Sequence, residues 1–258
     1  MRQLLLPAAL LAAALAAAAP ARADGSVTTA STIDPAKEYA YCLTLAKTKP
    51  EDGWEEALAW GSLGGGTPSQ HCGAVALIGM GKYEEAAKRL ESLAEESRRG
   101  DWMRAQMLEQ AGPAWLLAGN VDRADAVQRA ALKLVPNQPD LLLDHAITLA
   151  QVHHYKEAAA ELTDLLSRQP NRVEALTLRA SARRYLGDMA GARADIGLAL
   201  QLEPDFADAL VEQGIIRRLD GDAAGAREDW LKVIRTVTKG PVLDEARRNL
   251  ELLDVKTK

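Results

Sequence analysis

The fold is decided by residues 173–206, VEALTLRASARRYLGDMAGARADIGLALQLEPDF, and by how closely the neighbouring segments repeat their pattern. Small residues, a glycine and a proline stand at fixed places in this stretch, and the same residue types return at intervals of 34 residues. The clearest markers are Pro136, Pro170 and Pro204, which are spaced at that interval. A period of roughly 20 to 50 residues is typical of a chain built from stacked supersecondary units.

Four more positions repeat in register when the chain is divided into units 105–138, 139–172, 173–206 and 207–240. Position 8 holds a small residue in every unit, namely Gly112, Ala146, Ala180 and Gly214. Position 20 always holds alanine, namely Ala124, Ala158, Ala192 and Ala226. Positions 15 and 27 hold Gly119, His153, Gly187 and Gly221, and Ala131, Leu165, Ala199 and Val233, respectively. Apolar residues recur at helical spacing in both halves of each unit, which predicts two helices per unit.

This pattern resembles the tetratricopeptide-repeat (TPR) family, with small residues at 8 and 20, glycine at 15 and proline at 32. Small side chains let the two antiparallel helices of a unit touch, glycine allows the turn between them, and proline ends the second helix. The resemblance spans about residues 35 to 253. It implies an all-α, right-handed α-solenoid whose first helices line a concave groove, where TPR proteins usually bind extended or helical peptides.

The flanking segments follow the repeat less closely. Residues 67–104 are expected to form a TPR-like unit with about four extra residues, and residues 35–66 form a degenerate helical pair. Residues 241–258 are expected to form a capping helix and tail, because a terminal unit needs a polar outer face. Residues 24–34 are assigned as a polar linker.

The first 23 residues have the features of a cleavable secretory signal peptide. Arg2 precedes an apolar run from Leu4 to Ala19, and small residues before Asp24 suit cleavage after Ala23. The run is shorter than the roughly 20 residues that span a bilayer, although a retained anchor is the alternative. We therefore expect an exported protein, periplasmic or secreted, with no stable membrane anchor after cleavage.

The charge of the chain bears on its partner. The formal net charge is −5, and loss of Arg2 and Arg22 with the signal peptide would make it −7. An acidic chain is poorly suited to nucleic acid or to an anionic membrane surface. A protein or peptide partner is therefore expected, and no nucleic acid.

Cys42 and Cys72 are the two cysteines of the chain. Export would bring them into an oxidising compartment, where thiols pair. In the TPR register they fall at positions 5 and 6 of neighbouring first helices, which run side by side in a TPR stack, so a disulfide is expected. The alternatives are a redox pair or, with His71, a metal site. A separation of 30 residues without a Cys-x-x-Cys motif argues against a redox-active pair. Two cysteines and one histidine supply fewer ligands than the four of a structural zinc site.

The resemblance also implies that positions 5, 9 and 12 of each first helix face the groove. These positions include His71, Val75, Ile78, Glu109, Leu116, Leu143, Ile147, Thr177, Ser181, Arg184, Val211, Ile215 and Arg218. The Lys and Asn of TPR domains that clamp a terminal carboxylate are absent from positions 5 and 9, so that clamp is not predicted. The arginine pairs that contain Arg184 and Arg218 could hold acidic side chains of a partner. Alternatively, they pair with Asp188 and Asp222 in the turns of the chain itself.

No sequence motif supports catalysis. His153 and His154 occupy a turn with His145 one turn earlier, and none has an evident carboxylate and nucleophile partner. Glycines 64–66 lack the Lys-Ser or Lys-Thr pair of a phosphate-binding loop. Core or joint packing is expected of Trp54, Trp60, Trp102 and Trp230. We therefore expect no enzyme and no cofactor, but an adaptor that holds a partner in its groove or a subunit that assembles through its ends or convex face.

Overall fold

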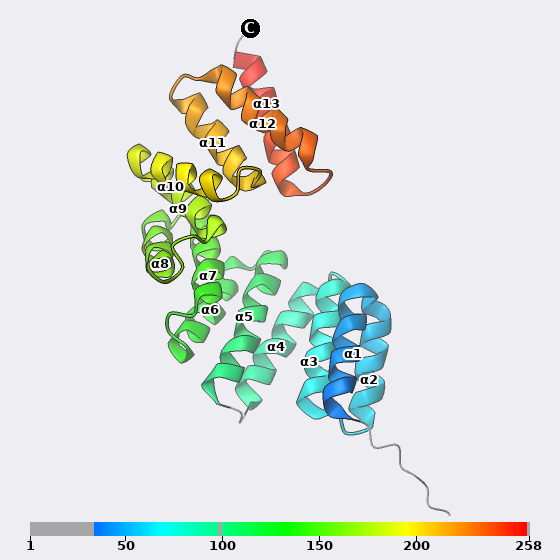
Figure 1. Cartoon of the computed structure of the whole chain (residues 1–258). Coiled ribbons are helices and arrows are strands. Elements are labelled where there is room, and N and C mark those ends of the chain that lie inside the picture. The colour runs from blue at the N-terminus through cyan, green and yellow to red at the C-terminus, as the bar shows by residue number, and fades with distance from the viewer. Residues whose placement is uncertain (1–33, 98–99, 257–258) are drawn as a thin grey trace, which may run out of the picture. The chain divides into compact units, whose positions relative to one another are not determined.

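The computed structural model describes residues 34–97 and 100–256, and within them the chain is entirely helical (Figure 1). The predicted signal peptide, with its cleavage site at Ala23 and Asp24, lies outside the described residues, as does nearly all of the predicted linker. Of the helices in the described part of the chain, none is both long and apolar enough to cross a membrane.

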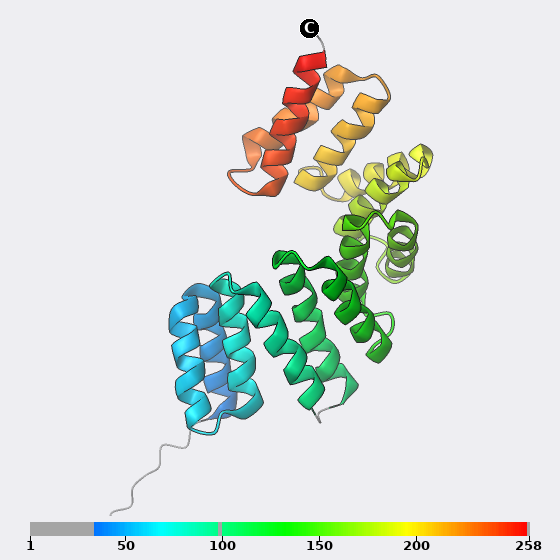
Figure 2. The same cartoon turned by 180° about the vertical axis from the view of Figure 1, so that it is seen from behind.

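Helices of similar length follow one another along the chain, joined by short turns. Their bounds are α1 Pro35–Thr48, α2 Pro50–Ser62, α3 Gly66–Gly79, α4 Tyr83–Glu96, α5 Asp101–Leu117, α6 Val121–Leu134, α7 Pro139–Gln151, α8 Tyr155–Arg168, α9 Val173–Tyr185, α10 Met189–Leu202, α11 Ala207–Leu219, α12 Ala223–Thr236 and α13 Pro241–Lys256. Each helix packs beside the next in both views (Figures 1 and 2). The predicted right-handed α-solenoid of helix-turn-helix units is confirmed.

In the units 105–138, 139–172, 173–206 and 207–240, the turn between the two helices has a left-handed residue at the repeated glycine position. Gly119, Gly187 and Gly221 have φ angles of 77°, 82° and 87°. His153 takes the same conformation, with φ 63°, in the unit where glycine is missing. For a residue with a Cβ, this left-handed conformation is unfavourable by about 1 to 2 kcal/mol. The His153 Nδ1 and the Tyr155 hydroxyl are 2.7 Å apart, and this hydrogen bond helps to hold the turn.

Position 8 holds a small residue because the two helices of a pair approach closely there. A Cβ on Gly214 would lie 2.4 Å from Nε1 of Trp230, and a Cβ on Gly112 would lie 2.6 Å from Cγ of Gln128. Both distances are far below ordinary van der Waals contact. Close helix approach, predicted from the repeat, is therefore built into α5–α6 and α11–α12.

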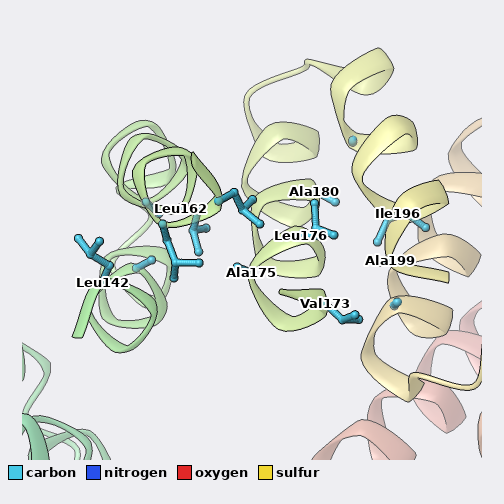
Figure 3. Packing of buried hydrophobic residues seen from close by; sticks show 14 of the residues in the cluster. Leu142, Leu162, Val173, Ala175, Leu176, Ala180, Ile196 and Ala199 are labelled. Atoms are coloured by element: carbon cyan, nitrogen blue, oxygen red, sulfur yellow. The ribbon is translucent and has the colours of Figure 1, made fainter. Parts of the chain in front are cut away.

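The hydrophobic core is a strip of side chains shared between neighbouring pairs. Leu142 of α7, Leu162 of α8, Leu176 of α9 and Ile196 of α10 belong to one buried cluster (Figure 3). Burial of each such side chain stabilises the fold by about 1.5 to 3 kcal/mol. Because one pair supplies the core of the next, no pair buries its apolar face alone.

The tryptophans divide between core and surface. Trp60 and Trp230 are buried, as expected, but Trp102 at the start of α5 is 60% exposed. The packing prediction was therefore wrong for Trp102, whose side chain lies at the first turn of its helix.

Cys42 of α1 and Cys72 of α3 form the predicted disulfide, with their Cα atoms 6.1 Å apart. Both side chains are fully buried in a cluster with Trp60, Ala57 and Ala76. The bridge joins two first helices, so it ties the degenerate first pair to the rest of the stack.

Candidate functional site

The candidate site is the surface formed by the first helices of successive pairs, α1, α3, α5, α7, α9, α11 and α13, which we call the groove face. Along it, α1 packs against α3, α9 packs against α11, and α11 packs against α13. Two hollows open on this face among the described residues, one at each end of the row.

The first hollow has a volume of about 630 Å³ and lies between α1, α3 and α5. Its walls are largely apolar and include Leu43, Val75, Met103 and Met107. Methionine side chains adapt readily to the shape of an apolar ligand. The first hollow could therefore receive apolar side chains of a partner.

A chain of hydrogen bonds crosses the first hollow. The Tyr39 hydroxyl lies 2.8 Å from Nδ1 of His71, and Nε2 of His71 lies 3.1 Å from Oε1 of Gln110. An amide oxygen can only accept, so Nε2 carries the proton and Nδ1 accepts from Tyr39. Burial lowers the pKa of His71 more than the Gln110 bond raises it, so the ring is neutral at pH 7. Lys47 is the charged side chain in this lining.

The second hollow has a volume of about 460 Å³ and is lined by α7, α9, α11 and α13, together with Phe206 just before α11. Its apolar wall includes Leu143, Leu178, Phe206 and Val211, and Ile147 is 36% exposed there. Its acidic side chains are Glu174, Asp208, Glu212 and Glu245. This hollow therefore combines an apolar wall with carboxylates.

No protein-family profile matches the chain, and no curated protein matches it. Among solved structures, a tetratricopeptide repeat protein from Parabacteroides merdae is 19% identical, with a TM-score of 0.62 over 84% of each chain. A thermophilic TPR protein of Thermus thermophilus is 18% identical, with a TM-score of 0.57 over 70% of this chain and 95% of that one. This chain has the TPR fold.

A third similar structure is described as YrrB, a TPR protein with an unusual peptide-binding site. It is 18% identical, with a TM-score of 0.54 over 74% of this chain and 91% of that chain. Sequence identities of 18 to 19% establish only that the folds are alike. The binding properties of the groove face therefore depend on the geometry of its own residues.

The TPR positions expected to face the groove are distributed unevenly. His71 and Val75 line the first hollow. The second hollow is lined by Leu143, Ile147, Thr177, Ser181 and Val211. The side chains of Ile78, Leu116 and Ile215 are instead partly buried and pack against the hydrophobic core clusters. The expected groove set therefore splits into two hollows and a group of packing residues.

Arg184, expected on the groove face, is engaged within the chain. Its Nε and Nη2 donate to the Glu212 carboxylate at 2.5 and 3.1 Å, which joins α9 to α11. Its guanidinium also lies 4.3 Å from the ring centre of Tyr185. In Arg218, by contrast, Nε is buried and has no hydrogen-bond partner among the described residues.

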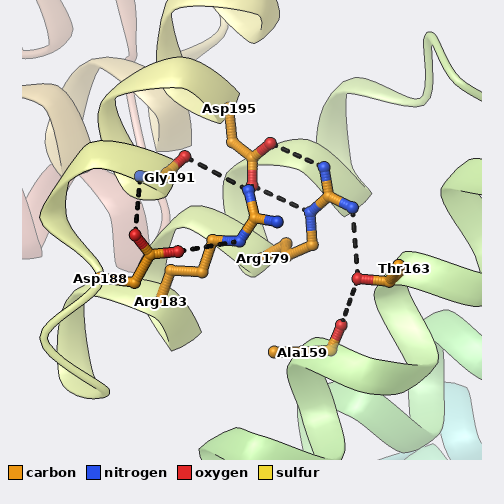
Figure 4. Close-up of polar contacts among 7 residues, drawn as sticks. All are labelled: Ala159, Thr163, Arg179, Arg183, Asp188, Gly191 and Asp195. Carbon is orange, nitrogen blue, oxygen red and sulfur yellow. Dashed lines mark hydrogen bonds and ion pairs between the residues drawn. The ribbon is translucent and has the colours of Figure 1, made fainter.

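The neighbouring arginine in each pair also binds acids of its own chain (Figure 4). Arg183 donates through Nη1 to Asp195 at 2.8 Å, and its Nε lies 3.6 Å from Asp188. Arg179 binds the same Asp195 through two nitrogens at 2.7 and 2.9 Å. One unit later, Arg217 binds Asp229 at 3.0 Å. These contacts favour internal pairing of Arg183, Arg184 and Arg217 over capture of an acidic partner.

Acidic residues of the groove face were the signal that sequence analysis missed. In units 139–172, 173–206 and 207–240, TPR positions 2 and 6 are acidic except at Leu178, the acids being Asp140, Asp144, Glu174, Asp208 and Glu212. Burial, followed by the charge of Asp140, raises the pKa of Asp144 to about 6. Burial and these two aspartates also raise the pKa of Glu109 on α5, which lines neither hollow. The carboxy-terminal part of the groove face is therefore acidic, and the spacing of these acids could have shown it.

His145 of α7 is buried, unlike the solvated turn histidines with which it was grouped. Its Nδ1 lies 2.9 Å from Glu161, and its Nε2 lies 2.8 Å from Asp125. Burial lowers the pKa of His145, but the two carboxylates outweigh burial and raise it overall. The ion pairs join α6, α7 and α8, so the role supported by the geometry is structural.

Proposed function

We propose that this protein is a non-catalytic adaptor that binds a peptide or helix of a partner protein along its groove face. The observation that carries the proposal is the pair of hollows, of about 630 and 460 Å³, in the row of first helices. Pockets of about 300 to 1,000 Å³ are of the size that buries a small ligand or a few side chains. An amphipathic helix or an extended segment places anchor residues into such hollows at regular spacing.

Three features support a protein as the occupant. The hollows lie on the same helical face, so a single segment can contact successive first helices. Exposed apolar side chains such as Ile147 lie beside carboxylates, a mixture typical of peptide grooves rather than of dry cofactor pockets. In YrrB, a solved TPR structure of the same fold, the described site binds a peptide.

We further propose that the protein acts in the periplasm or outside the cell. The amino-terminal sequence has the pattern of an export signal, and a disulfide such as Cys42–Cys72 persists in oxidising compartments. A mature chain that begins at Asp24 in the periplasmic fraction or the medium, identified by mass spectrometry, is the expected result. An uncleaved chain in the cytosol would contradict this location.

Crosslinking in intact cells tests the groove proposal. A photoreactive phenylalanine derivative at Ile147 lies in the second hollow, whereas the same residue at Leu198 of α10 is exposed on a second helix. We expect a recurrent envelope protein to be captured from Ile147 and not from Leu198. Equal capture from both positions, or capture from neither, would contradict binding on the groove face.

Assembly through the end of the solenoid is a second candidate function, because α13 exposes apolar side chains. Leu252 and Val255 are 52% and 74% exposed on this last helix. If the end is the interface, Leu252→Glu with Val255→Glu abolishes partner capture while Ile147→Ser leaves it intact. The opposite pattern supports the groove adaptor.

A further inference from the structure

The charges of the second hollow are all of one sign. Four carboxylates, those of Glu174, Asp208, Glu212 and Glu245, line it, and the described lining contains no lysine, arginine or histidine. The first hollow has the opposite character, since its lining holds Lys47, the neutral His71 and no carboxylate among the described residues. The two ends of the groove face therefore differ in the charge that they attract.

Two of the four carboxylates already have a basic partner. Glu212 is bound by Arg184, and Glu174 lies 3.3 Å from Nε of Arg172. Asp208 and Glu245, in the part of the chain that the structure describes, form no ion pair within 4.0 Å. Asp208 and Glu245 are therefore available to bind a cationic side chain of a partner.

The surroundings of Asp208 and Glu245 disfavour their negative charge. Both residues are solvent-exposed overall, but partial burial of the carboxyl group raises the pKa of Asp208. Burial is also the largest effect on Glu245, and the charges of Glu212 and Asp208 raise its pKa further, against the opposing effects of Arg248 and Arg184. A cation placed between the two carboxylates would stabilise both ionised forms.

The apolar wall beside these carboxylates suits the stem of a long basic side chain. Leu143, Ile147 and Val211 line the same hollow. Lysine and arginine bury their methylene stems along apolar surface while the charged head reaches a polar partner. A volume of about 460 Å³ accommodates such a side chain together with an apolar neighbour.

We infer that the second hollow binds a partner segment in which a lysine or arginine is flanked by apolar residues, with Asp208 and Glu245 receiving the cation. The inference rests on the proposed function and specifies the chemistry of its partner. An acidic segment, which the arginine pairs had suggested, is disfavoured in this hollow because four carboxylates line it and Arg184 is bound by Glu212.

Selection from a random library of short displayed peptides, on the full chain in its oxidised form, tests this inference. Enriched peptides should combine apolar residues with lysine or arginine at a frequency well above that of the library. Affinities of the best peptide are then measured by fluorescence anisotropy for wild type, for Asp208→Asn with Glu245→Gln, and for a control, Glu203→Gln with Glu251→Gln. Both double variants remove two negative charges, but Glu203 and Glu251 lie on α10's C-terminal cap and on α13, outside the lining.

We expect the Asp208 and Glu245 double variant to bind about tenfold more weakly than wild type, and the control to bind as wild type. Ile147→Ser should weaken binding of the same peptide, whereas Leu198→Ser should not. Peptides without an excess of lysine or arginine, or equal affinity for the two double variants, would overturn the inference and leave the adaptor proposal standing. If the wild-type chain enriches no peptide at all, both proposals fail.

Discussion

Removal of the Cys42–Cys72 disulfide should loosen one end of the solenoid and leave the other end unchanged. The bridge closes a loop with a sequence separation of 30 residues. In the chain-entropy treatment, such a loop contributes about 3.6 kcal/mol at 25 °C. Each helix pair of a solenoid contacts only its neighbours, so this free energy is concentrated in α1 and α2 and is not spread over the whole chain.

The magnitude translates into a measurable change in local opening. A loss of about 3.6 kcal/mol raises the equilibrium constant for detachment of the first pair roughly 400-fold. Amide hydrogen exchange, followed by mass spectrometry, reports such opening segment by segment. In Cys42→Ala with Cys72→Ala, we expect exchange in α1 and α2 to accelerate strongly, while α11 and α12 exchange as in the wild type.

Two results would refute this reasoning. Unchanged protection of α1 and α2 would mean that packing of Trp60, Ala57 and Ala46 alone holds the first pair. Equal loss of protection along the whole chain would mean that the solenoid unfolds as one cooperative unit. If the expected pattern is found, the first hollow should also be lost in the variant, because Tyr39 and Leu43 form its α1 wall.

The remaining predictions concern stability and are read from thermal or urea unfolding. Both amide atoms of Gln128 are buried without a hydrogen-bond partner among the described residues, so Gln128→Met should stabilise the protein by about 1 kcal/mol or more. His145 has a folded pKa above its unfolded value, so its contribution is fully present below about pH 6.5 and is lost as the pH rises through the folded pKa. The urea midpoint should therefore fall as the pH rises above about 6.5, and His145→Gln should flatten this dependence; an equal slope in the variant would contradict the assignment. Gly214→Ala should destabilise the protein by about 1 to 3 kcal/mol, because its Cβ would meet Trp230 at 2.4 Å. Gly197→Ala is the matched control in a helix, since its Cβ would meet no heavy atom of a neighbouring described element within 4 Å, and it should stabilise the protein by about 0.5 to 1 kcal/mol.

The helical repeat could be predicted from sequence because its causes are local. Every unit needs a left-handed turn residue and a small residue at the contact point, so a small residue recurs four times at position 8 and glycine recurs three times at position 15. The disulfide followed from the repeat as well, because the register places Cys42 and Cys72 on neighbouring first helices. His153 shows the limit of the rule, since it takes the glycine conformation without being glycine.

The character of the groove face depends on pairings that no repeat pattern contains. The sequence places Arg184 toward the groove, but only the packing of α9 against α11 brings it to Glu212 and removes it from the surface. The packing of α11 against α13 leaves Asp208 and Glu245 beside one hollow. Helix formation is governed by neighbours along the chain, whereas the charge of a groove depends on which side chains meet between helices. For this reason the sequence alone was enough for the solenoid and for the row of acids, and only the folded chain showed that Glu174 and Glu212 have basic partners while Asp208 and Glu245 lie beside the same hollow without an ion pair among the described residues.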